Sequence, residues 1–171
     1  MHRHPGGQEH TARMIALSGL KPPARWLDMG AGDGSAVRML RDLGFDAEGI
    51  DLCPRGEGVN AGDYLHCNYE SSFYDGILSQ CSFYVSGDVP LALTQAAQML
   101  KKGGRLVLSD VTENASLLSA QIEAAGFQIL HQEDPTPLWR EYYLELLWTQ
   151  DNVCLPHGKK FRYLLFVCER M

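Results

Sequence analysis

The sequence of 171 residues predicts an α/β fold, in which helices cover both faces of a mostly parallel central sheet. Short apolar runs alternate along the chain with segments whose apolar residues recur at helical spacing. A glycine-rich stretch at residues 30–34 joins the first such run directly to a helical segment. The length corresponds to about one domain at roughly 150 residues per domain. We therefore expect one core, with ligands bound at the carboxyl ends of its strands.

The first third of the chain contains an opening strand–helix–strand unit. It is preceded by a polar leader, residues 1–24, in which a short helix is expected over residues 8–17. Residues 25–29 form a brief apolar run, which predicts a strand. Residues 35–43 carry apolar side chains at helical spacing, and residues 45–51 predict a second strand.

The middle of the chain is less regular. Residues 52–72 contain several glycines and little periodicity, so the helix and strand that the alternation requires next are expected to be shortened or missing. A strand is predicted over residues 73–79. A helix that opens at Asp88 is expected to run to Leu100 and to end in the lysines and glycines at 101–104.

The last third resumes the alternation. A strand over residues 105–110 precedes a helix over 117–125 with an asparagine cap, and a further strand covers 127–131. Residues 132–160 interrupt the pattern with an acidic, proline-containing loop and an aromatic-rich helix. Residues 161–169 are β-rich and close the chain.

The composition disfavours several classes of partner. The 15 Lys and Arg residues are outnumbered by 21 Asp and Glu residues, and the net charge of −6 repels phosphate backbones and anionic lipid heads. Nucleic acids and membranes are therefore not expected as partners. No apolar run approaches the roughly 18 residues of a membrane span. The first residues lack the apolar stretch of a signal peptide, which predicts a cytoplasmic location.

The cysteines and the first histidines do not predict a metal site. The cysteines are odd in number and contain no CxxC pair, so neither a disulfide framework nor a thiolate zinc site is indicated. His2, His4 and His10 resemble a ligand cluster in composition only, and we interpret them as part of a frayed terminus. The cysteines are Cys53, Cys67, Cys81, Cys154 and Cys168.

Gly30, Gly32 and Gly34 lie between a predicted strand and a predicted helix. This arrangement places backbone N–H groups at a helix N-terminus and lets a nucleotide or nucleoside approach the chain closely. A phosphate-binding loop requires Gly-Lys-Ser/Thr, whereas Ser35 and Ala36 follow the last glycine. The sequence therefore disfavours an ATP or GTP hydrolase.

Two further residues, Ser35 and Asp28, help to distinguish which nucleotide or nucleoside the loop would bind. A dinucleotide fingerprint expects Gly or Ala where Ser35 stands. The carboxylate of Asp28 would repel a pyrophosphate and suits a ligand with an ammonium or sulfonium group. Asp51 ends the second predicted strand and is positioned to accept hydrogen bonds from ribose hydroxyls, a role shared by NAD and nucleoside binders. An NAD-linked oxidoreductase therefore remains a disfavoured alternative.

Four segments resemble the class I S-adenosylmethionine (SAM)-dependent methyltransferases, in the small-molecule branch with the generic methyltransferase domain. They are RWLDMGAGDGSAVRML, GIDLCP, GDYLHCNYESSFYDGILSQCSFYV and AAQMLKKGGRLVLSDV. The resemblance covers roughly residues 5–131. It implies a Rossmann-like methyltransferase sandwich with a C-terminal antiparallel strand, SAM as cofactor and a small-molecule acceptor. The segments HPGGQEHT and GFQILHQEDPTPLWRE also look like small bacterial arsenite methyltransferases.

The resemblance implies a SAM site made by the glycine loop and the neighbouring strand ends. The loop lies against the methionine part, Asp28 orients the loop and the ammonium group, and Asp51 binds the ribose hydroxyls. Asp63 accepts from the adenine amino group, while Tyr64 and Leu52 flank the ring. The implied cofactor residues are Asp28, Gly30, Ala31, Gly32, Gly34, Asp51, Leu52, Asp63, Tyr64, Ser79 and Gln80.

Candidates on the acceptor side follow from the chemistry. Methyl transfer is an in-line displacement, so the enzyme mainly aligns the two substrates and excludes water. Each candidate could also have a structural role: the cysteine as a packed thiol, the aromatic residues as packed rings, and the histidines as solvated imidazoles. An arsenite-type reaction would need Cys53, Cys67 and Cys81 to converge. The candidates are Cys81, Tyr84, His131, His157, Trp139, Tyr142, Tyr143 and Trp148.

We therefore expect a SAM-dependent methyltransferase that acts on a small molecule. The alternative is a SAM-binding, degenerate methyltransferase-like protein without turnover, acting as a regulator or partner subunit, and the irregular segment 52–72 favours it. We treat residues 1–171 as one domain. Within it, residues 1–24 are the helical leader, and residues 132–160 are a lid over the acceptor or, equally, core packing or a dimer surface.

Overall fold

A computed structural model describes residues 4–149 and 160–171. Its centre is a seven-stranded sheet with the order β3-β2-β1-β4-β5-β7-β6. This mixed α/β architecture confirms the predicted fold class. The strands are β1 (Arg25–Met29), β2 (Asp46–Asp51), β3 (Val59–Ala61), β4 (Tyr74–Gln80), β5 (Leu100–Thr112), β6 (Phe127–Glu133) and β7 (Arg162–Arg170).

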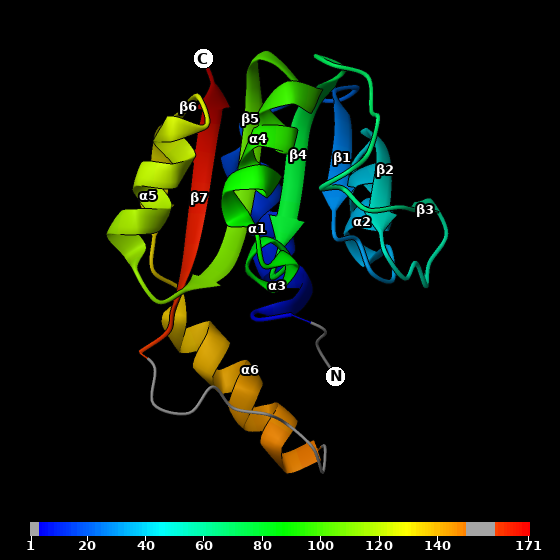
Figure 1. Cartoon of the computed structure of the whole chain (residues 1–171). Helices are drawn as coiled ribbons and strands as arrows, with labels where there is room; N and C mark the ends of the chain where they lie inside the picture. The colour runs from blue at the N-terminus through cyan, green and yellow to red at the C-terminus, as the bar shows by residue number, and fades with distance from the viewer. Residues whose placement is uncertain (1–3, 150–159) are drawn as a thin grey trace.

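All strands except β7 run in the same direction. β1 pairs in parallel with β2 and β4, and β4 pairs in parallel with β5. β7 is antiparallel to both β5 and β6, between which it lies. The expected C-terminal antiparallel strand is therefore confirmed, and the parallel strands end together at one edge of the sheet (Figure 1).

Helices cover both faces of the sheet, as Figure 1 shows. α1 and α2 contact each other on one face, and α4 and α5 contact each other on the opposite face. α6 extends beyond the sheet at the end where the arrow of β4 points. The helices are α1 (Gly7–Leu17), α2 (Ser35–Asp42), α3 (Phe83–Ser86), α4 (Val89–Met99), α5 (Ala115–Ala124) and α6 (Thr136–Thr149).

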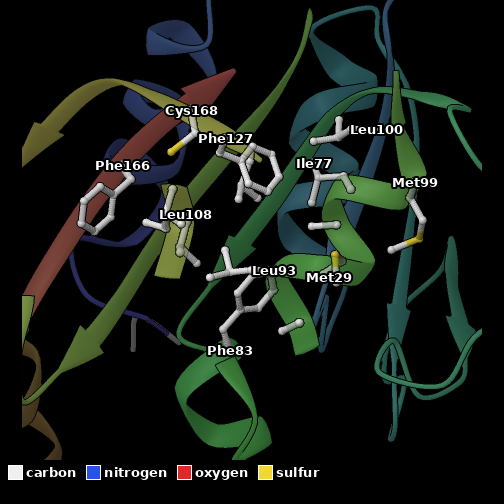
Figure 2. Close-up of a cluster of buried hydrophobic side chains, with 14 of the residues drawn as sticks. Met29, Ile77, Phe83, Leu93, Met99, Leu100, Leu108, Phe127, Phe166 and Cys168 are labelled. Carbon is white, nitrogen blue, oxygen red and sulfur yellow. The ribbon is translucent and has the colours of Figure 1, made fainter. Parts of the chain in front are cut away.

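The alternation of side chains along the central strands divides the core into two layers. On β5, Leu106 and Leu108 belong to the cluster that packs under α4 and α5, whereas Val107 belongs to the cluster under α1 and α2. On β7, Phe166 and Val167 divide in the same way. Figure 2 shows the first layer, in which side chains from the strands, α3 and α4 gather. The buried sheet explains why its strands are apolar on both faces.

One irregular segment agrees with the expectation, and two other segments differ from it. Residues 52–58 contain no helix and β3 has three residues, so the predicted shortening is confirmed. Residues 101–104 lie in β5 and do not end a helix, because Leu100 is already extended and pairs with Tyr74. The short helix α3 was not predicted. Within residues 4–149 and 160–171, no helix has the length and apolarity needed to cross a membrane.

Candidate functional site

The glycine loop adopts a conformation that requires glycine. Gly30, Gly32 and Gly34 have φ values of 85°, 53° and 71°, which other residues rarely adopt. At Gly30 there is a second constraint, because a Cβ atom would lie 2.1 Å from the Oγ of Ser82. The loop therefore passes close to the chain that follows β4.

Asp51 holds the glycine loop from the neighbouring strand. Its carboxylate accepts hydrogen bonds from the backbone N–H of Gly32 and of Cys53, each at 2.8 Å. The end of β2 and the loop after β1 are thereby fixed to each other. Since each carboxylate oxygen has two lone pairs, Asp51 retains acceptor capacity for a ligand hydroxyl.

A cavity of about 220 Å³ lies against this loop and is predominantly acidic. Asp28, Asp33 and Asp51 line it, together with one arginine, Arg55. Asp28 is 4% exposed, and burial, followed by the charges of Asp51 and Asp33, raises its pKa to about 7. A cation bound beside Asp28 would offset this repulsion, whereas a pyrophosphate would add to it. The remaining lining includes Gly30, Ala31, Gly32, Ser35, Gln80 and Cys81.

A second cavity, of about 380 Å³, lies beyond the end of β2. It brings together Leu52, Asp63 and Tyr64, as expected for the adenine side. The carboxylate of Asp63 accepts from the backbone N–H of Leu65 at 2.9 Å and contacts the Nδ1 of His66 at 2.8 Å, and these bonds hold its pKa below the usual range. Leu52 is 73% exposed, so this side of the cavity is open.

A third cavity, of about 420 Å³, lies between the strand ends and α6. Its lining is mainly aromatic and contains the carboxylate of Asp110, which is 2% exposed. Five predicted acceptor-side residues are present, namely Cys81, Tyr84, Trp139, Tyr142 and Tyr143. The described lining consists of His4, Pro5, Cys81, Tyr84, Val85, Asp110, Val111, Trp139, Tyr142, Tyr143 and Phe161.

Cys81 lines all three cavities and marks their junction. It has a φ of 53°, a strained conformation for a residue with a Cβ. Its Sγ lies 3.9 Å from the hydroxyl of Tyr163. Burial and the charge of Asp110 raise the pKa of the thiol to about 12, so it is protonated at neutral pH. The protonated state favours the interpretation of Cys81 as a packed thiol over its interpretation as a nucleophile.

Four predicted residues among those described do not line these cavities, and one of them is Trp148, which is 88% exposed. Gly34 caps the start of α2, and Ser79 is fully buried and donates its hydroxyl to the carbonyl of Met29 at 2.9 Å. His131 lies on β6, where its Nε2 is 3.3 Å from a carboxylate oxygen of Glu133. His2, Cys154 and His157 lie outside the described residues.

Several lining residues were missed by the sequence analysis of the site. Ser82 and Val85 belong to the unpredicted α3 segment. His4 lines two of the cavities, and His10 is buried, so neither is in a frayed terminus. Asp110 had a usable signal, because it lies near the end of a parallel strand, where ligands bind in such sheets.

The described residues provide no metal centre. Within 4–149 and 160–171, no group of three His, Cys, Asp or Glu side chains is arranged to hold a metal ion. Cys53 is exposed, while Cys67 and Cys81 are half-buried.

The comparison with protein families identifies the chain. A family model described as a methyltransferase domain matches residues 7–147. The chain belongs to this methyltransferase-domain family. The predicted class is therefore confirmed. The matched residues include the glycine loop, the parallel strands β1, β2, β4 and β5, and most of α6.

Known proteins share parts of this methyltransferase domain. A glycine/sarcosine/dimethylglycine N-methyltransferase of Actinopolyspora halophila is 30% identical over 115 residues, which are 57% of this chain and 20% of that protein. This chain thus spans about a fifth of the length of that curated relative.

Solved structures with the same fold contain SAM or its demethylated product. The phosphoethanolamine N-methyltransferase 2 of Haemonchus contortus, in complex with SAM, has a TM-score of 0.80 at 17% identity, covering 98% of this chain and 53% of that one. The 1,6-didemethyltoxoflavin-N1-methyltransferase of Burkholderia thailandensis, with S-adenosylhomocysteine, has a TM-score of 0.69 at 16% identity, covering 96% and 77%. At these identities the likeness establishes the fold.

Proposed function

We propose that the chain is a SAM-dependent methyltransferase that transfers a methyl group to a small-molecule acceptor. One observation carries the proposal. An acidic cavity at the glycine loop and an aromatic cavity under α6 meet at two shared lining residues, His4 and Cys81. A group transfer requires such a junction, because donor and acceptor must approach each other in line while water is kept out.

The residues of the acidic cavity fit SAM. The buried carboxylate of Asp28 shares the cavity with Asp33 and Asp51, whose negative charges raise its pKa, and an ammonium group would offset this repulsion. The glycine loop gives close access to the backbone, and Asp51 has acceptor capacity for ribose hydroxyls. In the adjoining cavity, Asp63 would accept from the adenine amino group, with Tyr64 and Leu52 beside the ring.

The chain's own residues supply alignment and shielding. When bound, SAM supplies an electrophilic methyl group on a sulfonium. Gly30, Gly32 and Asp51 would fix the cofactor, and the rings of Tyr84, Trp139 and Tyr143 would hold the acceptor on the far side of Cys81. No base is assigned, since an acceptor with a free lone pair reacts once aligned.

We also propose a domain organisation and a location. Residues 1–171 would form one domain in which the 132–160 segment acts as a lid through α6, and the lining of the aromatic cavity by α6 supports this role. Residues 1–24 belong to the same domain, since Met14 and Ile15 pack against residues of the sheet. A cytoplasmic location is supported by the free cysteines among the described residues.

The second candidate is a SAM-binding protein without turnover. The absence of a helix over residues 52–58 and the 73% exposure of Leu52 favour it, because an open adenine side weakens binding. Methyl transfer to any acceptor in a screen excludes this candidate.

A thermal-shift titration with SAM, S-adenosylhomocysteine and NAD tests the cofactor. A ligand at about 100 times its Kd stabilises the native state by about 2.7 kcal/mol, which raises the Tm by about 5–11 °C for a chain of this size. We expect a rise with the first two ligands only. A rise with NAD alone, or with none of them, contradicts the proposal.

A further inference from the structure

The aromatic cavity has a wall of five side chains that touch in series. The ring centroids of Tyr84 and Phe161 are 5.6 Å apart at 89°, and Phe161 lies 6.3 Å from Trp139. Trp139 lies 4.6 Å from Tyr143, which is perpendicular to Tyr142 at 5.7 Å. Since consecutive rings are tilted or perpendicular, the wall is curved and is not one flat stacking surface.

The same cavity carries negative charge. The carboxylate of Asp110 accepts from the backbone N–H of Tyr84 at 2.9 Å and of Val111 at 2.8 Å. Burial raises the pKa of Asp110 to about 6, which leaves it mostly ionised at neutral pH. The hydroxyl of Tyr84, a lining residue, donates to the carboxylate of Glu113 at 3.2 Å.

Positive charge is scarce in the described part of this lining. It contains no lysine or arginine, and His4 is its one basic side chain. Tyr142, Tyr143 and Cys81 remain neutral at pH 7, because burial raises the pKa of each. A carboxylate or phosphate on the acceptor would therefore meet Asp110 with His4 as the one basic side chain in the described part of the lining.

We propose that this cavity takes an acceptor whose reacting group is an amine on an apolar body, without a carboxylate or phosphate group. Aromatic faces and a carboxylate both attract a cationic nitrogen. The volume of about 420 Å³ lies at the small end of ligand sites, which suits a small amine. The inference rests on the proposed function for its chemistry.

The reaction explains why this environment helps. The lone pair of the neutral amine forms the new N–C bond as the S–C bond breaks, and the electron pair of that bond stays on sulfur. The positive charge thus moves from sulfur to nitrogen, and the methylammonium product then releases a proton to water. Asp110 and the rings would stabilise the charge that develops on nitrogen in the transition state.

Calorimetric titration of the full chain, with and without saturating S-adenosylhomocysteine, tests the inference. The probes are benzyltrimethylammonium and 2-phenylethylamine as cations, 2-phenylethanol as a neutral analogue and 3-phenylpropionate as an anion. We expect both cations to bind at least about tenfold more tightly than the other two probes. Equal or tighter binding of the alcohol or the acid, or no binding of either cation at millimolar concentration, overturns the inference.

Two substitutions on α6 sharpen the test. Trp139→Leu should weaken cation binding about 5- to 30-fold and change binding of the alcohol less than about threefold. Trp148→Leu is the matched control, because Trp148 is 88% exposed and does not line the cavity. An equal loss for all probes in Trp139→Leu means a purely steric role and contradicts the inference.

The two proposals can fail separately. A protein that binds S-adenosylhomocysteine but shows no preference for cations keeps the proposed function and loses this inference. A protein that does not bind S-adenosylhomocysteine loses the proposed function, and the titrations without it still report the charge preference of the cavity.

Discussion

The carboxylate of Asp51 accepts the backbone N–H of Gly32 at 2.8 Å, so the end of β2 fixes the loop that follows β1. A second bond from the N–H of Cys53 ties the same side chain to the chain that leaves β2. Asp51 therefore has a structural task in addition to the expected contact with ribose, and substitutions of Asp51 report on both tasks.

Asp51→Ala should weaken binding of S-adenosylhomocysteine by about 1–3 kcal/mol, because charge-assisted hydrogen bonds to the ribose are lost. The free energy of unfolding should also fall by about 1–2 kcal/mol, since two backbone N–H groups lose their acceptor. Calorimetry and urea unfolding measure the two effects. Asp51→Asn keeps one acceptor oxygen, so its stability should lie between wild type and Asp51→Ala. Unchanged affinity in both variants contradicts the ribose contact.

Asp28→Asn should stabilise the ligand-free protein and weaken cofactor binding. Burial raises the pKa of Asp28 from 3.8 to about 7, so folded chains retain a proton that unfolded chains release between these values. The contribution of Asp28 to stability is therefore largest below pH 4 and is lost as the pH rises towards 7. The variant should be about 2–4 kcal/mol more stable at pH 8 and similar to wild type near pH 4.

Urea unfolding at both pH values checks this expectation. Asp42→Asn, an exposed position at the end of α2, is the control and should change stability little at either pH. Equal stability of Asp28→Asn and wild type at pH 8 would show that the carboxylate is not under electrostatic repulsion in the free protein.

Gly30→Ala should be strongly destabilising. The residue has a φ of 85°, and its new Cβ would lie 2.1 Å from the Oγ of Ser82, so backbone strain and steric overlap act together. We expect a loss of about 2–4 kcal/mol in thermal unfolding. Gly19→Ala separates the two causes, because Gly19 has a φ of 71° with no atom within 4 Å of the added Cβ, and only about 1 kcal/mol should be lost. Similar losses in both variants would rule out the steric part.

Cys81 should resist alkylation at pH 8, because burial and Asp110 raise the pKa of its thiol to about 12. Exposed Cys53 should react readily under the same conditions. Iodoacetamide labelling followed by mass spectrometry of peptides compares the two rates within one sample. Faster labelling of Cys81 than of Cys53 would reopen its role as a nucleophile.

The sequence by itself determined the alternation of elements and marked the residues of the proposed donor side. β1 was predicted at its observed bounds, and the asparagine cap before α5 is seen as a bond from the N–H of Leu117 to Asn114 at 3.0 Å. These features depend on neighbouring residues, through periodicity, capping and the need for glycine at positive φ. The glycine loop and Asp51 lie at strand ends, which local patterns also mark.

The aromatic cavity, which we propose as the acceptor side, was decided by the tertiary structure. Tyr84 from α3, Trp139 from α6 and Phe161 just before β7 are separated by more than 20 residues in sequence, and the sheet order and the direction of β7 bring them to one edge. His131, which looked equivalent to them in sequence, lies on the edge strand β6 beside Glu133. No local sequence pattern encodes which of these residues line the cavity, because this depends on which strands pair and on where α6 leaves the sheet.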